Sequence, residues 1–196
     1  MRIKAALLLL LFAPSSLHAQ PPSVEGIDIT NRGIYEIEVK KKIDDENLVG
    51  SYRDIVTNIR RIKTTTNIPA RLCISFGLEY IIVGAPSGVE IPIKMVTRFP
   101  KQGLYNPDTK LTVHWNETVV NRTIGKAHFR SYTLDKEWEV VPGVWTFELW
   151  YQGRRLVEQM FNLVEPCANG CDKSQPQPGC GDLPIPVSLG VSPRRT

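Results

Sequence analysis

The stretch VWTFELWYQGRRLVEQMFNLV, residues 144–164, decides the fold class. In its first half a large apolar side chain stands at every second position, which is the period of a β-strand with one buried face. Gly153 supplies the positive φ angle that a tight hairpin corner requires, and a second strand follows it. We therefore expect a β-hairpin whose inward side chains are Trp145, Phe147, Leu149 and Tyr151.

The same alternation recurs along the chain before this hairpin. The segments expected to form strands are residues 34–40, 54–63, 73–83, 89–99, 110–115, 119–123, 126–133 and 138–141. Roughly eight or nine short strands at a spacing of about ten residues, with no long amphipathic helix, are typical of an antiparallel sandwich. We predict an all-β protein, an immunoglobulin-like antiparallel β-sandwich with a Cys/Pro/Gly-rich C-terminal tail.

Several details of these strands are specific enough to be tested. The turn residues 85–88 (Ala-Pro-Ser-Gly) predict a hairpin between strands 73–83 and 89–99, and Pro92 suggests an edge strand or a bulge. From the alternation we expect these further side chains to point inward: Tyr35, Ile37, Val39, Leu111, Val113 and Trp115.

The N-terminus has the features of a secretory signal peptide. Two basic residues precede an apolar run at 5–13, and small residues follow, so we expect cleavage between Ala19 and Gln20. The apolar run is shorter than the roughly 20 residues that cross a bilayer, which predicts no stable membrane insertion after cleavage. We expect a soluble periplasmic or secreted protein with a signal peptide (1–19), a leader (20–32), a sandwich domain (33–165) and a looped or disordered disulfide-containing tail (166–196).

The cysteines are even in number and belong to a chain expected in an oxidising compartment, so disulfides are the default interpretation. The candidates are Cys73, Cys167, Cys171 and Cys180. One bridge is expected within the tail trio, with Cys73 either paired to the remaining tail cysteine or buried as a small apolar residue. A zinc site is disfavoured because no histidine lies near the three local thiols.

Charge argues against one class of partner. The chain has 24 Lys and Arg against 20 Asp and Glu. Loss of Arg2 and Lys4 with the signal peptide leaves 22 against 20, a balance near +2. Such a balance lacks the basic footprint that neutralises many phosphates, so we expect no nucleic-acid partner.

Four separated blocks carry a family resemblance. They are residues 33–35 (GIY), 64–70 (TTTNIPA), 97–100 (TRFP) and 141–154 (VPGVWTFELWYQGR). In this order they resemble the secreted bacterial family known only as domain of unknown function 3859, over about residues 33–164. The resemblance implies an immunoglobulin-like sandwich and export, and it brings neither an activity nor site residues.

The residues offer little sign of catalysis. After cleavage the remaining histidines are His114 and His128, both expected on outward strand positions, and no G-x-S-x-G or catalytic cysteine signature is present. Paired carboxylates such as Glu137 and Glu139 are ordinary on the solvated face of a strand. We therefore predict no catalytic residue, no metal site and no cofactor.

A possible recognition surface comes from residues of the outward parity. Trp150 lies opposite in parity to the inward residues of its strand, and His128, Arg130 and Tyr132 share the face expected to be outward on theirs. Exposed aromatic residues with a nearby arginine are typical of surfaces that recognise a protein or glycan. The alternative is that these side chains lie against the second sheet or the tail.

The sequence therefore favours a non-catalytic binding or assembly module of the cell envelope, with an unknown protein or glycan as its partner. Two alternatives stay open. One is an uncharacterised periplasmic hydrolase or metal-dependent enzyme with a site built from loops. The other is a small-ligand carrier, which we expect to need an apolar cavity between the sheets.

Overall fold

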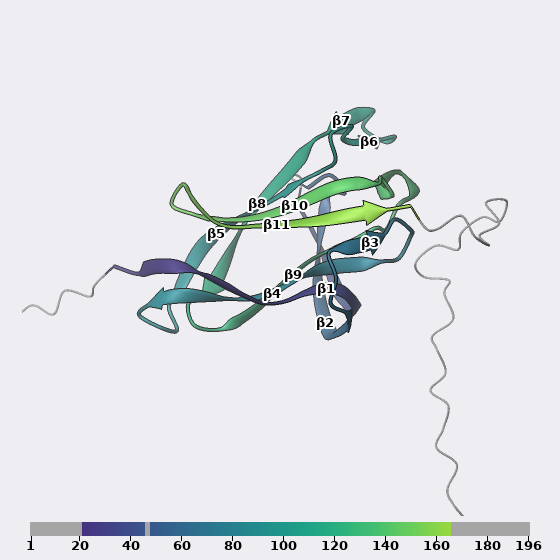
Figure 1. Cartoon of the computed structure of the whole chain (residues 1–196). Coiled ribbons are helices and arrows are strands. Elements are labelled where there is room, and N and C mark those ends of the chain that lie inside the picture. The colour runs from purple at the N-terminus through teal and green to yellow at the C-terminus, as the bar shows by residue number, and fades with distance from the viewer. Residues whose placement is uncertain (1–20, 46–47, 166–196) are drawn as a thin grey trace, which may run out of the picture.

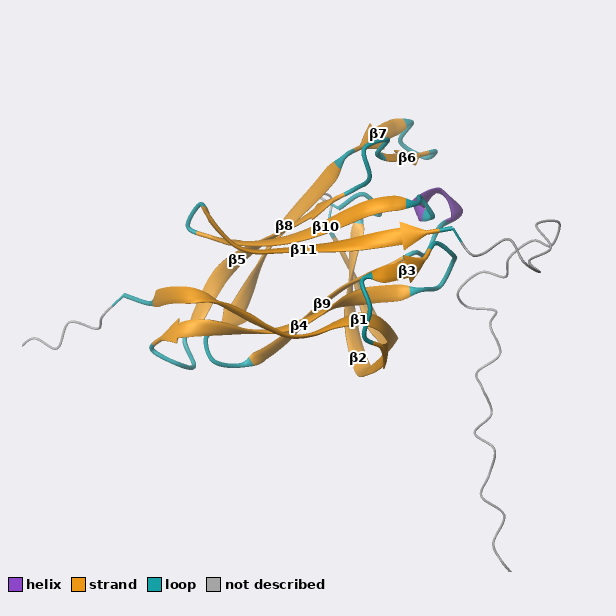
Figure 2. Ribbon diagram, in the orientation of Figure 1, coloured by secondary structure: helices purple, strands orange, loops and turns teal. Residues whose placement is uncertain are grey.

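The computed structural model describes residues 21–45 and 48–165, which form strands and a single turn of 3-10 helix within these ranges (Figures 1 and 2). The elements in chain order are β1 (Ser23–Asp44), β2 (Tyr52–Lys63), β3 (Asn67–Pro69), β4 (Ser75–Ala85), β5 (Glu90–Arg98), β6 (Leu104–Asn106), β7 (Leu111–Val113), β8 (Trp115–Thr123), β9 (Ala127–Thr133), η1 (Glu137–Glu139), β10 (Gly143–Tyr151) and β11 (Arg154–Val164).

The strands form two facing sheets. The first sheet has the order β2-β1-β4-β9, and the second has the order β3-β11-β10-β5-β8. Neighbouring strands are antiparallel, except that the short β3 runs parallel to β11. A separate ribbon of β6 and β7 lies at one end (Figure 1). The predicted antiparallel β-sandwich is confirmed.

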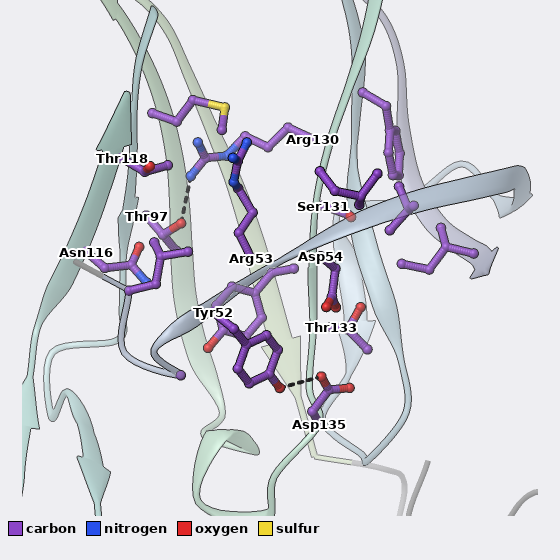
Figure 3. Close-up of a pocket in the computed structure, with 18 of the residues that line it drawn as sticks. Tyr52, Arg53, Asp54, Thr97, Asn116, Thr118, Arg130, Ser131, Thr133 and Asp135 are labelled. Atoms are coloured by element: carbon purple, nitrogen blue, oxygen red, sulfur yellow. Dashed lines mark hydrogen bonds between the residues drawn. The ribbon is translucent and has the colours of Figure 1, made fainter. Parts of the chain in front are cut away.

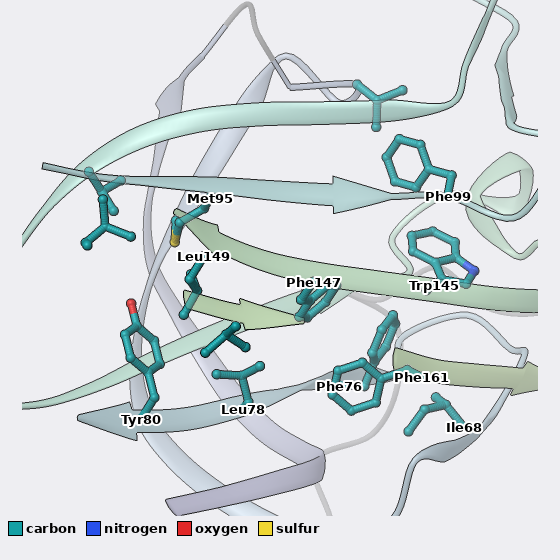
Figure 4. Close-up of a cluster of buried hydrophobic side chains, with 14 of the residues drawn as sticks. Ile68, Phe76, Leu78, Tyr80, Met95, Phe99, Trp145, Phe147, Leu149 and Phe161 are labelled. Atoms are coloured by element: carbon teal, nitrogen blue, oxygen red, sulfur yellow. The ribbon is translucent and has the colours of Figure 1, made fainter. Parts of the chain in front are cut away.

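The core lies between the sheets and is richest in aromatic rings (Figure 4). The predicted hairpin 144–164 is present as β10 and β11, and the four inward side chains expected on β10 are buried. The Phe76 ring on β4 lies at the centre of the cluster. Its centroid is 5.8 Å from that of Trp145, 5.5 Å from Phe147 and 5.2 Å from Phe161. Rings from both sheets thus join the two layers.

The hairpin predicted at residues 85–88 is wrong. β4 belongs to the first sheet and β5 to the second, so the connection carries the chain from one layer to the other. Each strand buries one face in the same core. Turn residues such as these suit a connection between two sheets as well as a hairpin within one sheet, so they did not distinguish the two. β5 is also internal rather than an edge strand, although Pro92 lies beyond the part that pairs with β10.

The inward face predicted for residues 110–115 is also wrong in part. Leu111 is 62% exposed and Trp115 is 55% exposed, while Val113 is half-buried. β7 pairs with β6 outside the main sheets, and β8 starts anew at Trp115 with Asn116 and Val120 turned inward. The alternation therefore reverses its parity between β7 and β8.

β1 is the longest strand and changes partner along its length. It begins at Ser23, inside the segment 20–32 that we expected to be a leader, and its first part pairs with β4 as far as Tyr35. Its second part pairs with β2 (Figure 1). Gly33, with a φ angle of +146°, lies where the change occurs. Tyr35 is buried as predicted, whereas Val39 is 43% exposed.

We call the second part of β1, β2 and the turn between them the β1–β2 arm (residues 36–45 and 48–63). No helix among the described residues is long and apolar enough to cross a membrane.

Candidate functional site

A cavity of about 420 Å³ lies beneath the β1–β2 arm (Figure 3). β9 is the last strand of the first sheet, and β8 is the last strand of the second. The cavity is lined by both of these strands, by β5 and by the arm. The arm thus covers a gap between the two sheets at an open side of the sandwich.

Polar contacts hold the arm over this gap. The Tyr52 hydroxyl donates to Asp135 Oδ2 (2.9 Å), Thr118 Oγ1 donates to Asp45 Oδ2 (2.8 Å), and Asn106 Nδ2 donates to the carbonyl oxygen of Val49 (3.1 Å). These partners lie after β9, on β8 and on β6, so the arm is anchored at several points around the cavity.

Arg130 on β9 dominates one end of the cavity. It is only 8% exposed, its Nη2 atom donates to Thr97 Oγ1 (2.6 Å), and its guanidinium lies 4.7 Å from the centre of the Phe147 ring. Its Nε atom is buried and has no hydrogen-bond acceptor. Burial lowers the pKa of Arg130 to about 10, so the side chain remains charged at neutral pH.

Two further arginines line the same cavity. Arg53 on the arm meets Arg130 across it, and the buried Nε atom of Arg53 also lacks an acceptor (Figure 3). Arg122 on β8 is held by its Nε atom, which donates to the Tyr80 hydroxyl (3.2 Å). No carboxylate among the described residues forms an ion pair with any of these three side chains. This end of the cavity therefore carries uncompensated positive charge.

The other end of the cavity carries carboxylates that already have partners. Glu139 accepts hydrogen bonds from the Tyr132 hydroxyl (2.7 Å) and from the backbone N–H groups of Asp135 and Lys136 (2.9 Å each). Burial raises the pKa of Glu139, and these hydrogen bonds oppose the shift. The Lys42 Nζ atom lies 3.6 Å from Asp135 Oδ2.

Asp54 belongs to the same acidic end. Its Oδ1 atom lies 3.9 Å from Lys42 Nζ and accepts no hydrogen bond. Burial raises the pKa of Asp54, while the charge of Lys42 lowers it. The single amine of Lys42 thus lies between two carboxylates and offsets part of their charge.

The structure separates the four residues predicted as one recognition surface. His128, Arg130 and Tyr132 do share a face of β9, but that face points toward the second sheet rather than outward, so this prediction is wrong. His128 Nε2 donates to the Thr123 carbonyl oxygen (2.8 Å), and burial lowers its pKa. The Tyr132 ring packs 4.9 Å from Trp145, centre to centre. The alternative that these side chains lie against the second sheet is correct.

The reason for the reversal is that β9 is covered on both faces. Its other face carries Phe129, whose ring packs 4.8 Å from that of Tyr35 on β1. Ser131 and Thr133, on the same side as Phe129, line the cavity under the arm. Sequence alternation identifies two faces of a strand, but it cannot show which one meets solvent when both are partly buried.

Trp150 lies apart from these residues, on the outer face of the second sheet. Its Nε1 atom donates to Glu148 Oε2 (2.8 Å), and Glu148 also accepts from Arg98 Nε (2.7 Å). A shallow hollow here is lined by Lys94, Val96, Arg98, Trp115, Glu117, Glu148 and Trp150. We call this the outer tryptophan face. Unlike the arginine end of the cavity, it pairs its charges internally.

The other sequence candidates contribute no assembled site. His114 is exposed and does not line the cavity. Within the described ranges, no cluster of three or more His, Cys, Asp or Glu side chains is arranged to hold a metal ion. Cys73 lies in the turn before β4. The residues Ala19, Gln20, Cys167, Cys171 and Cys180 lie outside the described residues.

Sequence reasoning missed Arg53, Arg122 and the hydroxyl side chains that share the cavity with Arg130. The basic residues of β2 were visible among its apolar ones, but nothing local showed that the arm folds back over β9. The length of β1 was not visible either, because only residues 34–40 were expected to form this strand, close to the usual length of about 5–6 residues.

Comparisons with known proteins agree with this architecture. The fold is similar to the crystal structure of an immunoglobulin-like protein from Pseudomonas aeruginosa, with a TM-score of 0.51 and 22% sequence identity over 74% of this chain and 98% of that one. The sandwich is therefore immunoglobulin-like. No curated protein matches the chain. The model of the family described as Domain of unknown function (DUF3859) matches residues 23–163, so the chain belongs to this family.

Proposed function

We propose that the protein is a non-catalytic binding module of the bacterial cell envelope, and that its ligand site is the cavity under the β1–β2 arm. The observation that carries this proposal is the cavity itself. Its volume of about 420 Å³ falls within the range of roughly 300–1,000 Å³ typical of small-molecule sites. Side chains from both sheets and the arm converge on it, as binding sites require.

The envelope location is supported by the N-terminal sequence. Residues 1–19 have the basic start, the short apolar run and the small residues before Gln20 that direct export. A ligand of this module would then be a molecule of the periplasm or of the extracellular medium.

The contacts around the cavity support binding rather than catalysis. A nucleophile needs a base within hydrogen-bond reach, and that base needs a free ring nitrogen or carboxylate oxygen. His128, the histidine that lines the cavity, uses Nε2 on a backbone carbonyl. The Thr133 hydroxyl shares a hydrogen bond with Ser75, and Thr97 accepts from Arg130. These three side chains are thus engaged in holding the fold, and Asp54 Oδ1 is the buried carboxylate oxygen of the cavity that accepts no hydrogen bond among the described residues.

The lining also indicates which ligands fit. A carrier of apolar molecules would need an apolar cavity, whereas this one has a mixed lining, in which arginine, threonine, serine, asparagine and carboxylate side chains lie beside isoleucine, valine, leucine and methionine. Buried polar groups without partners are costly, so they favour a ligand that can hydrogen-bond to them. We therefore propose a small polar ligand.

Filling the cavity tests this proposal. Ser131→Phe places a large side chain into the space, while Thr30→Phe adds the same ring at an exposed position of β1. We expect some members of a panel of small polar metabolites, with anionic, cationic and neutral compounds, to raise the melting temperature of the wild type and of Thr30→Phe. Ser131→Phe is expected to lose this protection. Equal protection of Ser131→Phe, or no protection of the wild type, would contradict the proposal.

A second candidate function is recognition of an envelope glycan by the outer tryptophan face. Trp115 is exposed there, and Trp150 is held in one orientation by Glu148. The charges of this face are paired, since Lys94 lies 3.4 Å from Glu117 and Arg98 bonds to Glu148. A face with paired charges and flat aromatic rings suits a neutral, hydroxyl-rich partner.

Calorimetric titration with chitotetraose, a neutral oligosaccharide, tests this second candidate. We expect Trp150→Ala to weaken binding at least about tenfold, because truncation of a tryptophan at the centre of a binding surface can cost about 2 kcal/mol or more. Val144→Ala, at an exposed position of the same strand, is expected to bind as the wild type does. Undetectable binding by the wild type, or unchanged binding by Trp150→Ala, would rule this candidate out.

A further inference from the structure

We propose that the ligand of the cavity carries an anionic group, a phosphate or a carboxylate, and that Arg130 and Arg53 bind it. This inference rests on the proposed function, because it names the chemical class of the ligand for the same cavity. It is carried by the geometry of the two guanidinium groups and by the absence of a carboxylate partner for either of them among the described residues.

The first step of the argument is the cost of burying Arg130. A charged group taken from water into a protein interior costs several kcal/mol unless an opposite charge and hydrogen bonds compensate it. Arg130 is 8% exposed and has the Thr97 hydroxyl and the face of Phe147 as neighbours. A hydroxyl and a ring face offset only part of that cost. An anion in the cavity would supply the missing charge.

The protein itself shows what a satisfied arginine looks like. Arg98, on β5 of the other sheet, bonds through Nε to the buried carboxylate of Glu148, although its own side chain is 52% exposed. The half-exposed Arg98 thus has a carboxylate partner, although water already solvates part of its charge. The buried Arg130 has no carboxylate partner among the described residues, although little water reaches it. This contrast points to an external partner for Arg130.

The second step is the orientation of the unpartnered atoms. An arginine binds an oxyanion most strongly through two parallel N–H groups, and the edge that includes Nε is one of the edges that offers such a pair. The Nε atoms of both Arg53 and Arg130 are buried and lack acceptors. Figure 3 shows the two guanidinium groups meeting over the cavity, one from the arm and one from β9. Two such edges suit the oxygens of one phosphate or carboxylate.

The third step is repulsion between like charges. Arg53 and Arg130 meet head to head, and the charge of Arg122 also lowers the pKa of Arg130. Such an arrangement destabilises the folded protein unless an anion lies between the cations. The acidic end of the cavity does not fill this role. Asp135 and Glu139 are engaged by Tyr52, Lys42 and Tyr132, and the charge of Asp54 is offset by Lys42 rather than by either arginine.

Titration with inorganic phosphate, sulfate and citrate at constant ionic strength tests the inference on the purified full-length protein. Binding at about ten times the dissociation constant is expected to raise the melting temperature by about 4 °C. Arg130→Met and Arg53→Met are each expected to weaken binding at least tenfold in calorimetry. Arg60→Met is the matched control, because Arg60 lies on the same strand as Arg53, is exposed and is paired with Glu36.

A second readout separates binding from a structural role. Removal of an unpaired buried charge relieves its desolvation, so ligand-free Arg130→Met is expected to melt no lower than the wild type. If Arg130 had a purely structural role, its substitution would lower the melting temperature both with and without anions. If Arg130→Met does not fold, Arg53→Met, at a position nearer the surface, carries the test.

The outcomes distinguish this inference from the proposed function. Equal stabilisation of Arg130→Met, Arg53→Met and the wild type by these anions would overturn the inference, as would no effect of any of the three anions on the wild type. If neutral polar compounds then still protected the wild type and not Ser131→Phe, the cavity would remain the ligand site and only its anionic ligand would be refuted. If neither the anions nor the neutral compounds protected the wild type, both the anionic ligand and the cavity as a ligand site would be refuted.

Discussion

Replacing Trp145 with alanine is expected to lower the free energy of unfolding by about 3–5 kcal/mol, the usual cost of deleting a large buried aromatic side chain. Trp145 is fully buried, and its indole N–H donates to the carbonyl oxygen of Val141 (3.0 Å). Its ring makes edge contacts with Phe76 and Phe99 (Figure 4) and with Tyr132. The substitution would therefore leave a cavity where the two sheets join.

Equilibrium denaturation in urea measures this loss. Trp115→Ala is the matched control, because it is the same substitution at a side chain that is 55% exposed, and we expect it to cost less than about 1 kcal/mol. A similar loss for the two variants would show that the inward face of β10 has been assigned incorrectly.

The second large effect is expected at Gly33, where β1 changes partner. Its φ angle of +146° lies in a region that is almost restricted to glycine, and a Cβ atom there would lie 1.9 Å from the carbonyl oxygen of Lys63. Strain of this backbone kind costs about 1–3 kcal/mol, and the collision with β2 adds to it. We expect Gly33→Ala to lower the free energy of unfolding by at least about 2 kcal/mol.

Gly26→Ala on the same strand is the control for Gly33→Ala. No atom lies within 4 Å of a Cβ built at Gly26, so this variant is expected to be close to neutral. Because Gly33 is where the arm begins, Gly33→Ala should also weaken any ligand binding in the cavity. Stability and binding equal to those of Gly26→Ala would show that the arm tolerates a different path.

Much of the sandwich was predictable because its signals are local. The hairpin 144–164 combines strict alternation with glycine at the corner, and both features act within a few residues. Residues 89–99, expected to form a strand, show the same alternation in the structure, since Ile91, Ile93 and Met95 are buried. In these segments the apolar side chains at alternate positions meet the core, so polarity alone identifies the inward face.

The errors arise where tertiary contacts override that simple division. The connection at residues 85–88 has hairpin residues but joins two layers, and the pairing of β4 with β1 and β9 could not be read locally. Arg130 was expected outside because of its parity along the strand, and it lies inside because the arm and the second sheet cover both faces of that strand. The candidate site depends on this long-range folding of the arm, so the predicted recognition surface included only three of the residues that line it, His128, Arg130 and Tyr132.

The arm also protects the molecule against aggregation. The terminal strands β8 and β9 each have a hydrogen-bonding edge that no strand of their own sheet occupies, and such edges can recruit strands from other chains. By folding across this side of the sandwich, the arm shields both edges at once. If the arm detached, both edges would become exposed together. We then expect domain swapping of the arm between two copies and, at high concentration, aggregation into fibrils.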